Sequence, residues 1–417
     1  MVGRRAGAVP RHGERCVHRL RSRSESDVTE DDGGTPIEGS CDPAFEAVRQ
    51  AFADNFALRG EVGAAVCVVV HGRTVVDLAG GWADHDRRRA WMPTTPVNVF
   101  SVGKPLSALV ALRLVAEGRL DLDAPIAGWW PEFAAAGKES VTLRQVLSHR
   151  AGLPAVRRRL PPGAMFEWDL MCSALAAQEP WWGPGSAHGY HVNTYGFLVG
   201  EVIRRVTGRS VGALVADWIA GPIGADLSIG IPADRDGEVA EFLWPDTFVA
   251  PEEEPAGMSA DALMVHNTYF NPSGFSGAGV VNTAGWRRAE IPSTNVHGTA
   301  RGVARLYEAM AGGGAVDGVR IVEQELLAAA TDEVSVGEDR VLARPSRFGL
   351  GFQLTQPERP LGPNPGAFGH FGAGGSLGFG DPEAGVAFGY VMNNVGPRWQ
   401  NPLNGALIDA VYESLGT

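Results

Sequence analysis

Three features are missing from this chain of 417 residues, and each absence excludes a class of protein. No run of about 18 or more apolar residues occurs, so the sequence predicts no membrane span. The net charge of −12 offers no basic face of the kind that nucleic acids bind. The four cysteines have no Cys-x-x-Cys spacing and no His-Glu-x-x-His pattern occurs, so neither a disulfide framework nor a metal site is indicated.

Lysine is the scarcest charged residue. Of the 36 basic residues, only Lys104 and Lys138 are lysines, and all the others are arginines. Arginine cannot lose its proton in a protein, whereas a buried lysine can, so a lysine in this chain hints at proton transfer. Lys104 follows Ser101 by three residues at the start of a helical pattern, which puts both side chains on one helix face. Chance can also supply a Ser-x-x-Lys spacing, so the pair alone only suggests a nucleophile and its base.

The N-terminal segment differs from the rest of the chain. Residues 1–23 contain seven arginines and one acidic residue, and an acidic patch follows within residues 25–32. No apolar segment follows this basic start, so the sequence predicts no secretory signal. An organelle transit peptide stays open, but we expect residues 1–41 to be a disordered arm of a cytoplasmic protein.

The apolar pattern predicts strands at both ends of the ordered chain and helices between them. Two β-rich runs within residues 62–78 surround a glycine turn, and strand patterns return within residues 348–392. We therefore expect an α+β fold, with one antiparallel sheet built from both chain ends, flanking helices and an inserted, mostly helical region. The expected domain covers residues 42–417, with its α/β part in 42–130 and 340–417 and its helical and loop region in 131–339.

Five segments, taken in chain order, resemble the motifs of one enzyme superfamily. They are Ser101-Val102-Gly103-Lys104, residues 118–125, residues 147–154, Gly189-Tyr190-His191 and residues 368–375. This combination resembles the serine β-lactamase and penicillin-binding-protein superfamily, in the class C-like branch that includes carboxylesterases, D-amino-acid peptidases and acyltransferases. The resemblance covers roughly residues 42–415. The fold that it implies, helices on an antiparallel sheet with a helical insertion, agrees with the expectation above.

The resemblance also implies roles for individual residues. Ser101 would be the nucleophile, and Lys104 would take its proton if burial or a nearby positive charge keeps the amine neutral. Tyr190 would share this work by passing a proton to the leaving group and later helping to activate water. The oxyanion hole would consist of the backbone N–H groups of Ser101 and Ala373. The substrate-binding side of the site would be formed by Ser101, Ala373, His370 and Gly372.

Two motifs depart from the pattern that is common in the family. The second motif is commonly Tyr-x-Asn, but Val192 stands at its third position, and Asn193 comes one residue too late without a local shift. The third motif is commonly Lys-Thr-Gly, but here it reads His370-Phe371-Gly372. In β-lactamases the missing groups help to hold the amide and the carboxylate of the drug. The expected nucleophile and base are both present, but the groups that would bind a β-lactam are partly missing. This combination is similar to the esterase branch.

The leading prediction is a serine hydrolase that acts as a carboxylesterase on small acyl esters, with no metal or organic cofactor. Its partner would be a small-molecule ester or amide, and the sequence indicates no oligomeric state. The irregular segments 155–190 and 230–295 are expected to line the substrate pocket. Three alternatives stay open: a β-lactamase or D-amino-acid peptidase, an acyltransferase, and a non-catalytic scaffold on the same fold.

Overall fold

An antiparallel sheet of ten strands forms the centre of the protein. The computed structural model describes residues 29–30, 35–245, 251, 257–396 and 400–416. Within them the strand order is β1-β2-β4-β3-β15-β14-β13-β12-β11-β10. The strands are β1 (Thr29–Glu30), β2 (Pro36–Cys41), β3 (Gly63–Val70), β4 (Arg73–Gly81), β10 (Ser335–Asp339), β11 (Arg344–Phe348), β12 (Gln353–Leu354), β13 (Phe368–Phe371), β14 (Leu377–Asp381) and β15 (Val386–Met392).

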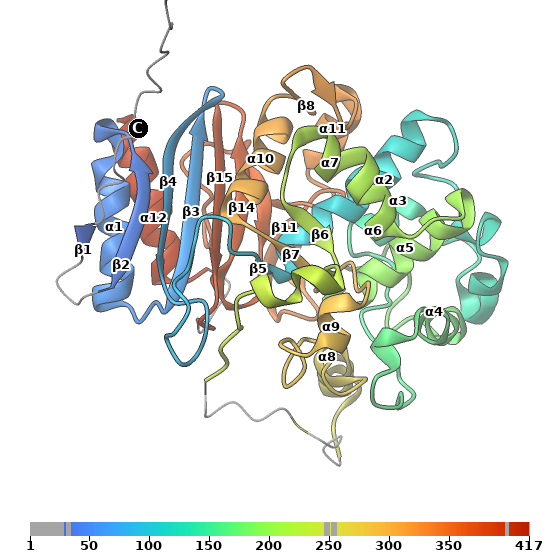
Figure 1. Ribbon diagram of the computed structural model, residues 1–417. Helices are drawn as coiled ribbons and strands as arrows, with labels where there is room; N and C mark the ends of the chain where they lie inside the picture. The colour runs from blue at the N-terminus through green and yellow to red at the C-terminus, as the bar shows by residue number, and fades with distance from the viewer. Residues whose placement is uncertain (1–28, 31–34, 246–250, 252–256, 397–399, 417) are drawn as a thin grey trace, which may run out of the picture.

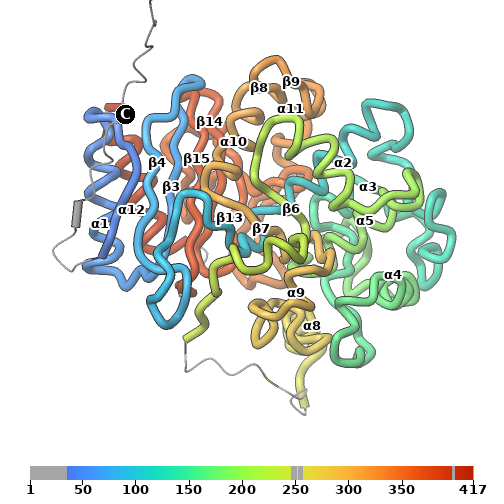
Figure 2. Tube along the Cα trace, in the orientation of Figure 1, coloured from blue at the N-terminus to red at the C-terminus, as the bar shows by residue number. Residues whose placement is uncertain are grey.

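The two ends of the chain meet in the middle of this sheet. Strand β3 pairs antiparallel with the whole of β15, from Val70 opposite Val386 to Ala64 opposite Met392. Figure 2 shows the blue N-terminal strands beside the red C-terminal strands. Both β3 and β15 are buried almost throughout, as expected for apolar runs that are covered on both faces. The predicted α+β class with a sheet built from both chain ends is confirmed.

The ordered part of the chain begins earlier than the sequence predicted. Strand β2, Pro36–Cys41, pairs with β4 and buries the side chain of Ile37. The expectation of an arm over residues 1–41 is therefore wrong for residues 29–30 and 36–41, while residues 1–28 and 31–34 lie outside the described residues. Only one side chain of β2 is buried, and the strand is held mainly by backbone pairing, which leaves no apolar pattern to recognise.

Helices cover both faces of the sheet. Helices α1 (Glu46–Leu58) and α12 (Pro402–Leu415) pack together on one face, and α10 (Ala300–Ala311) lies on the other (Figure 1). No helix among the described residues is long and apolar enough to cross a membrane.

The region between the two halves of the sheet is mostly helical. Its helices are α3 (Leu143–Leu147), α4 (Trp168–Ala177), α5 (Thr194–Thr207), α6 (Val211–Val215), α7 (Gly221–Ile223), α8 (Ala260–Phe270), α9 (Ala284–Arg288) and α11 (Gln324–Thr331). Its short strands are β5 (Val97–Asn98), β6 (Leu227–Ile229) and β7 (Val296–Gly298), which form a small antiparallel sheet, and the hairpin of β8 (Ala315–Val316) and β9 (Val319–Arg320).

Most of helix α2 (Lys104–Ala116) lies buried in the interior of the protein. Every residue from Lys104 to Leu112 is buried, and the helix packs against α5, α6 and α11. A helix that is apolar on all sides must be surrounded by protein. The helix therefore starts at the interior of the fold, with its first residue, Lys104, enclosed.

A glycine lets α10 approach the sheet closely, which gives a test of this packing. A Cβ atom on Gly389 in β15 would lie 2.3 Å from the Ala300 carbonyl oxygen and 2.7 Å from the Ala304 nitrogen. Because these are backbone atoms, Gly389→Ala must push the helix away, and we expect it to lower the free energy of unfolding by about 1–3 kcal/mol.

The matched control is Gly405→Ala in helix α12, where a new Cβ atom would meet nothing within 4 Å. This change should stabilise the protein by about 0.5–1 kcal/mol, because glycine is a poor helix former. Urea unfolding measures both variants, and a wild-type midpoint for Gly389→Ala would contradict the packing.

Candidate active site

Ser101 lies on a tight turn that directs it into a cavity. The turn is the 3-10 helix η2 (Phe100–Gly103), which runs directly into α2. Phe100 has a left-handed backbone with φ of 50°, an uncommon conformation for a bulky residue. The Phe100 ring is buried and contacts Phe242 edge-on, with ring centroids 4.8 Å apart. This packing holds the strained residue and sets the direction of the serine that follows it.

The amine of Lys104 is fully buried next to Ser101. Three oxygen atoms surround its Nζ: Ser101 Oγ at 2.9 Å, the Val192 carbonyl at 2.7 Å and the Ser293 carbonyl at 3.1 Å. A neutral amine has two N–H groups for the two carbonyls and one lone pair for the serine proton, so this environment matches the neutral form. Burial also holds the pKa of Lys104 well below its usual range.

Lys138, the other lysine, shows the opposite arrangement. Its Nζ donates to three carbonyls, those of Ala135, Ala176 and Gln178, at 2.6, 2.9 and 2.6 Å. Three acceptors need three N–H groups, which only the charged form has. The oxygen partners of the two buried lysines therefore match different protonation states, neutral for Lys104 and charged for Lys138. Of the two, only Lys104 contacts a group that can give it a proton.

Tyr190 completes the group that the sequence predicted. Its ring centroid lies 4.7 Å from Lys104 Nζ, and its ring stacks on Phe348 with centroids 5.6 Å apart. Burial raises the pKa of Tyr190 well above its usual range, while a hydrogen bond with Ser101 acts in the lowering direction. The tyrosine is thus a neutral phenol beside the serine, suited to giving a proton rather than to accepting one. The structure brings Ser101, Lys104 and Tyr190 together.

The remaining predicted site residues fall into two groups. Ala373 lines the cavity together with Ser101. His370 and Gly372 do not line it: His370 is buried, with its ring centroid 5.9 Å from that of Tyr190. Its Nδ1 donates to the Phe371 carbonyl at 2.8 Å, and burial lowers the pKa of His370 to about 3. His370 is therefore a neutral residue behind the site, not a substrate contact on the described cavity wall.

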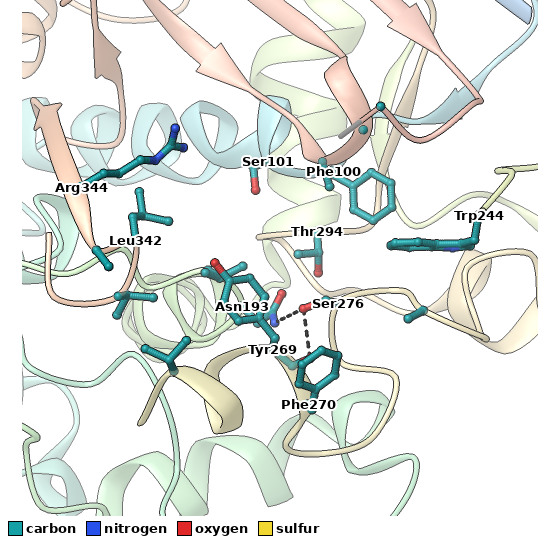
Figure 3. A pocket seen from close by; sticks show the side chains of 18 residues that line it. Phe100, Ser101, Asn193, Trp244, Tyr269, Phe270, Ser276, Thr294, Leu342 and Arg344 are labelled. Carbon is teal, nitrogen blue, oxygen red and sulfur yellow. Dashed lines mark hydrogen bonds between the residues drawn. The ribbon is translucent and has the colours of Figure 1, made fainter. Parts of the chain in front are cut away.

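The cavity in front of Ser101 has a volume of about 780 Å³ and mostly apolar walls (Figure 3). Arg344 is the one charged residue among the described residues that line it. The segment 230–295 supplies much of the lining, as predicted, but no described lining residue comes from 155–190, and residues 341–344 were not foreseen. The side chains that shape the space are Phe100, Trp244, Val265, Tyr269, Phe270, Val341 and Leu342.

Asn193 reaches the cavity wall even though it stands one residue late in the second motif. Its Nδ2 donates to the Thr268 carbonyl at 2.8 Å. It also donates to Ser276 Oγ at 2.9 Å, as Figure 3 shows. Val192 meanwhile uses its backbone carbonyl to hold Lys104. The sequence could not reveal this second role, because every residue type carries the same carbonyl.

Comparisons with known proteins show the family to which the chain belongs. A family model described as Beta-lactamase matches residues 48–413. Esterase/beta-lactamase LipL of Mycobacterium tuberculosis is 37% identical over 369 residues, covering 87% of this chain and 84% of LipL.

Two solved structures share the whole fold. A penicillin-binding protein homologue from Caulobacter crescentus has a TM-score of 0.83 and 41% identity, covering 91% of this chain and 99% of the homologue. A family VIII carboxylesterase has a TM-score of 0.83 and 42% identity, with the same coverage of 91% and 99%. The family match spans nearly all the described fold, and the chain belongs to the β-lactamase family as a serine hydrolase.

Proposed function

We propose that this protein is a carboxylesterase that forms an acyl-enzyme at Ser101 and hydrolyses small, uncharged acyl esters. The observation that carries the proposal is the buried Lys104 amine, 2.9 Å from Ser101 Oγ and matched by its other two oxygen partners to the neutral state. A neutral amine at that distance is the base that a serine hydroxyl needs.

Acylation proceeds through three proton transfers. Lys104 takes the Ser101 proton while Oγ attacks the ester carbonyl carbon, and a tetrahedral oxyanion forms. Among the described residues, no protein acceptor takes the backbone N–H of Ser101 or Ala373, so both are available to the oxyanion. The Tyr190 hydroxyl then gives its proton to the departing alkoxide and regains one from Lys104. Deacylation repeats these steps with water as the nucleophile and Ser101 as the leaving group.

The walls of the site favour esters over β-lactam drugs. Val192 and Phe371 stand where the family commonly has polar groups, and the described lining is apolar apart from Arg344 and a few neutral polar groups. A family VIII carboxylesterase is among the similar structures. β-Lactam hydrolysis is the second candidate, because LipL is named as both an esterase and a β-lactamase and because Asn193 reaches the cavity.

Replacing the nucleophile tests the acyl-enzyme. We expect Ser101→Ala to lower kcat for 4-nitrophenyl butyrate by at least about a thousandfold, because no other group can form the ester bond. Ser107→Ala, which alters another buried serine of the same stretch, is the control and should stay within about twofold of wild type. Undiminished turnover by Ser101→Ala would remove this serine from its role.

The two lysines offer a matched test of the base. Lys104→Arg keeps a cation but cannot accept a proton, so kcat should fall by about 10²–10⁴-fold. Lys138→Arg should keep the wild-type kcat, since Lys138 is held as a donor to three carbonyls.

The pH dependence of wild-type kcat/KM tests whether Lys104 acts in its neutral form. Below the Lys104 pKa the amine is protonated and cannot act as a base, so kcat/KM should fall as pH decreases through that pKa. Because burial lowers this pKa, the fall should lie well below the usual range of a lysine, and activity should persist at neutral pH.

The arginine variant also has an outcome that would contradict the proposal. Near-normal acylation by Lys104→Arg is incompatible with Lys104 as the base.

The ester preference has its own test. With purified protein, kcat/KM for 4-nitrophenyl butyrate should exceed that for a chromogenic cephalosporin by at least about a hundredfold, the size expected when two or more polar contacts are missing. Comparable values for the two substrates would favour the β-lactamase candidate instead.

A further inference from the structure

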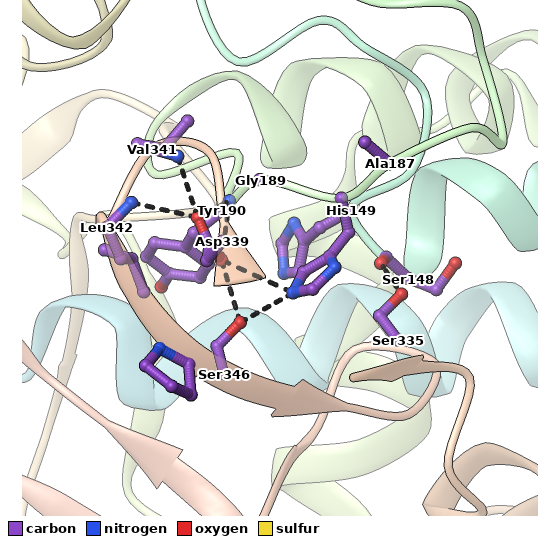
Figure 4. Close-up of polar contacts among 12 residues, drawn as sticks. Ser148, His149, Ala187, Gly189, Tyr190, Ser335, Asp339, Val341, Leu342 and Ser346 are labelled. Atoms are coloured by element: carbon purple, nitrogen blue, oxygen red, sulfur yellow. Dashed lines mark hydrogen bonds and ion pairs between the residues drawn. The ribbon is translucent and has the colours of Figure 1, made fainter. Parts of the chain in front are cut away.

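A buried carboxylate, Asp339, lies at the end of strand β10 and belongs to none of the sequence motifs. Only 1% of the residue is exposed. Its oxygen atoms accept hydrogen bonds from the backbone N–H of Tyr190 at 3.0 and 3.1 Å, and from Ser346 Oγ at 2.9 Å. The backbone N–H groups of Val341 and Leu342 also donate to it, both at 2.9 Å. Figure 4 shows these groups converging on the carboxylate from different segments.

The backbone around Tyr190 is held from a second side by His149. The Gly189 N–H donates to the His149 carbonyl at 3.1 Å, and the His191 N–H donates to His149 Nδ1 at 3.2 Å. Together with the bond to Asp339, three consecutive N–H groups are therefore fixed. Asp339 accepts the hydrogen bond from the middle one, the N–H of Tyr190 itself.

The ring of Tyr190 packs against the hairpin of strands β10 and β11, which also carries Asp339. It contacts His149, with centroids 4.9 Å apart, and Phe348, on which it stacks at an interplanar angle of 2°. Phe348 ends strand β11, which pairs with β10 in a hairpin that begins with Asp339 opposite Arg344. Both the backbone and the ring of the tyrosine thus depend on this hairpin.

The same carboxylate also holds part of the cavity wall. Val341 and Leu342, whose N–H groups point at Asp339, line the cavity that Ser101 faces. One side chain therefore connects the wall that a substrate would touch to the tyrosine beside the nucleophile.

We propose that Asp339 is a positioning residue that holds the Tyr190 hydroxyl in place for proton transfer to the leaving group. This inference rests on the proposed function, in which Tyr190 protonates the departing alkoxide. Every group that contacts Asp339 within hydrogen-bond distance can act as a donor, which a carboxylate satisfies with two acceptor oxygens. An amide offers only one oxygen and turns the other position into a donor, so Asp339→Asn weakens the cluster and Asp339→Ala removes it.

The test compares two esters that share an acyl group but differ in the leaving group. Ethoxide needs a proton as it leaves, whereas 4-nitrophenolate leaves without one, so ethyl butyrate depends on Tyr190 more than 4-nitrophenyl butyrate does. The quantity measured is the ratio of kcat/KM for the ethyl ester to that for the nitrophenyl ester. Loss of folded enzyme lowers both values equally and leaves this ratio unchanged, whereas a displaced Tyr190 lowers it.

We expect the ratio to fall at least about tenfold in Asp339→Ala, by a smaller factor in Asp339→Asn, and in the same direction in Tyr190→Phe. The matched control is Asp381, another buried carboxylate, at the end of β14 away from Ala373. It accepts hydrogen bonds from the N–H groups of Glu383 and Ala384 and from the Tyr412 hydroxyl. Asp381→Asn and Asp381→Ala should keep the wild-type ratio even if they lower stability.

A wild-type ratio in Asp339→Asn overturns the inference, and so does a wild-type ratio in a folded Asp339→Ala. If Asp339→Ala does not fold, Asp339→Asn decides alone. A fall of equal size in the Asp381 variants also counts against it, because the effect would then belong to any buried carboxylate. Failure of the proposed function looks different: the wild type would hydrolyse neither ester, or Ser101→Ala would retain full turnover.

Discussion

The desolvation of one amine is the constraint on which the rest of the structure depends. Lys104 can stay neutral at the interior because its partners are two carbonyls and one hydroxyl, and these come from three distant parts of the chain. The sheet supports the turn that carries Ser101, the segment before α5 brings Val192, and the segment before β7 brings Ser293. The buried histidines near the site, His149, His191 and His370, are kept neutral mainly by their own burial. Burial, and not a neighbouring cation, is therefore what lowers the pKa of the lysine.

The features of the fold and site that depend on side-chain type or on repeating patterns could be predicted from the sequence. Apolar runs locate β3 and β15, and the three-residue spacing of Ser101 and Lys104 predicts their contact. The resemblance to the family adds Tyr190 and Ala373. Strand β2 escaped prediction because backbone pairing alone holds most of it.

Other parts of the site depend on groups that a sequence does not distinguish. The carbonyls of Val192 and Ser293 are chemically the same as any others, so only the fold selects them. Asp339 is one acidic residue among 48 and sits far from the motifs in sequence. His370 occupies a motif position, yet its Nδ1 donates to the Phe371 carbonyl, and the residue does not line the described cavity. Motifs thus pointed to the residues proposed to react, while tertiary contacts set the groups that hold them.

The pairing of β3 with β15 has a consequence for how the chain is made. Strand β3 ends at Val70 and its partner begins at Val386, so the chain between them must be synthesised before this edge of β3 is covered. Until then an apolar strand with unpaired backbone groups is exposed, which is the usual condition for association between unfinished chains. Ala373 is also synthesised late, so the proposed nucleophile, Ser101, exists long before one of the N–H groups proposed to stabilise its oxyanion. Completion of the sheet and completion of the site are therefore the same late event.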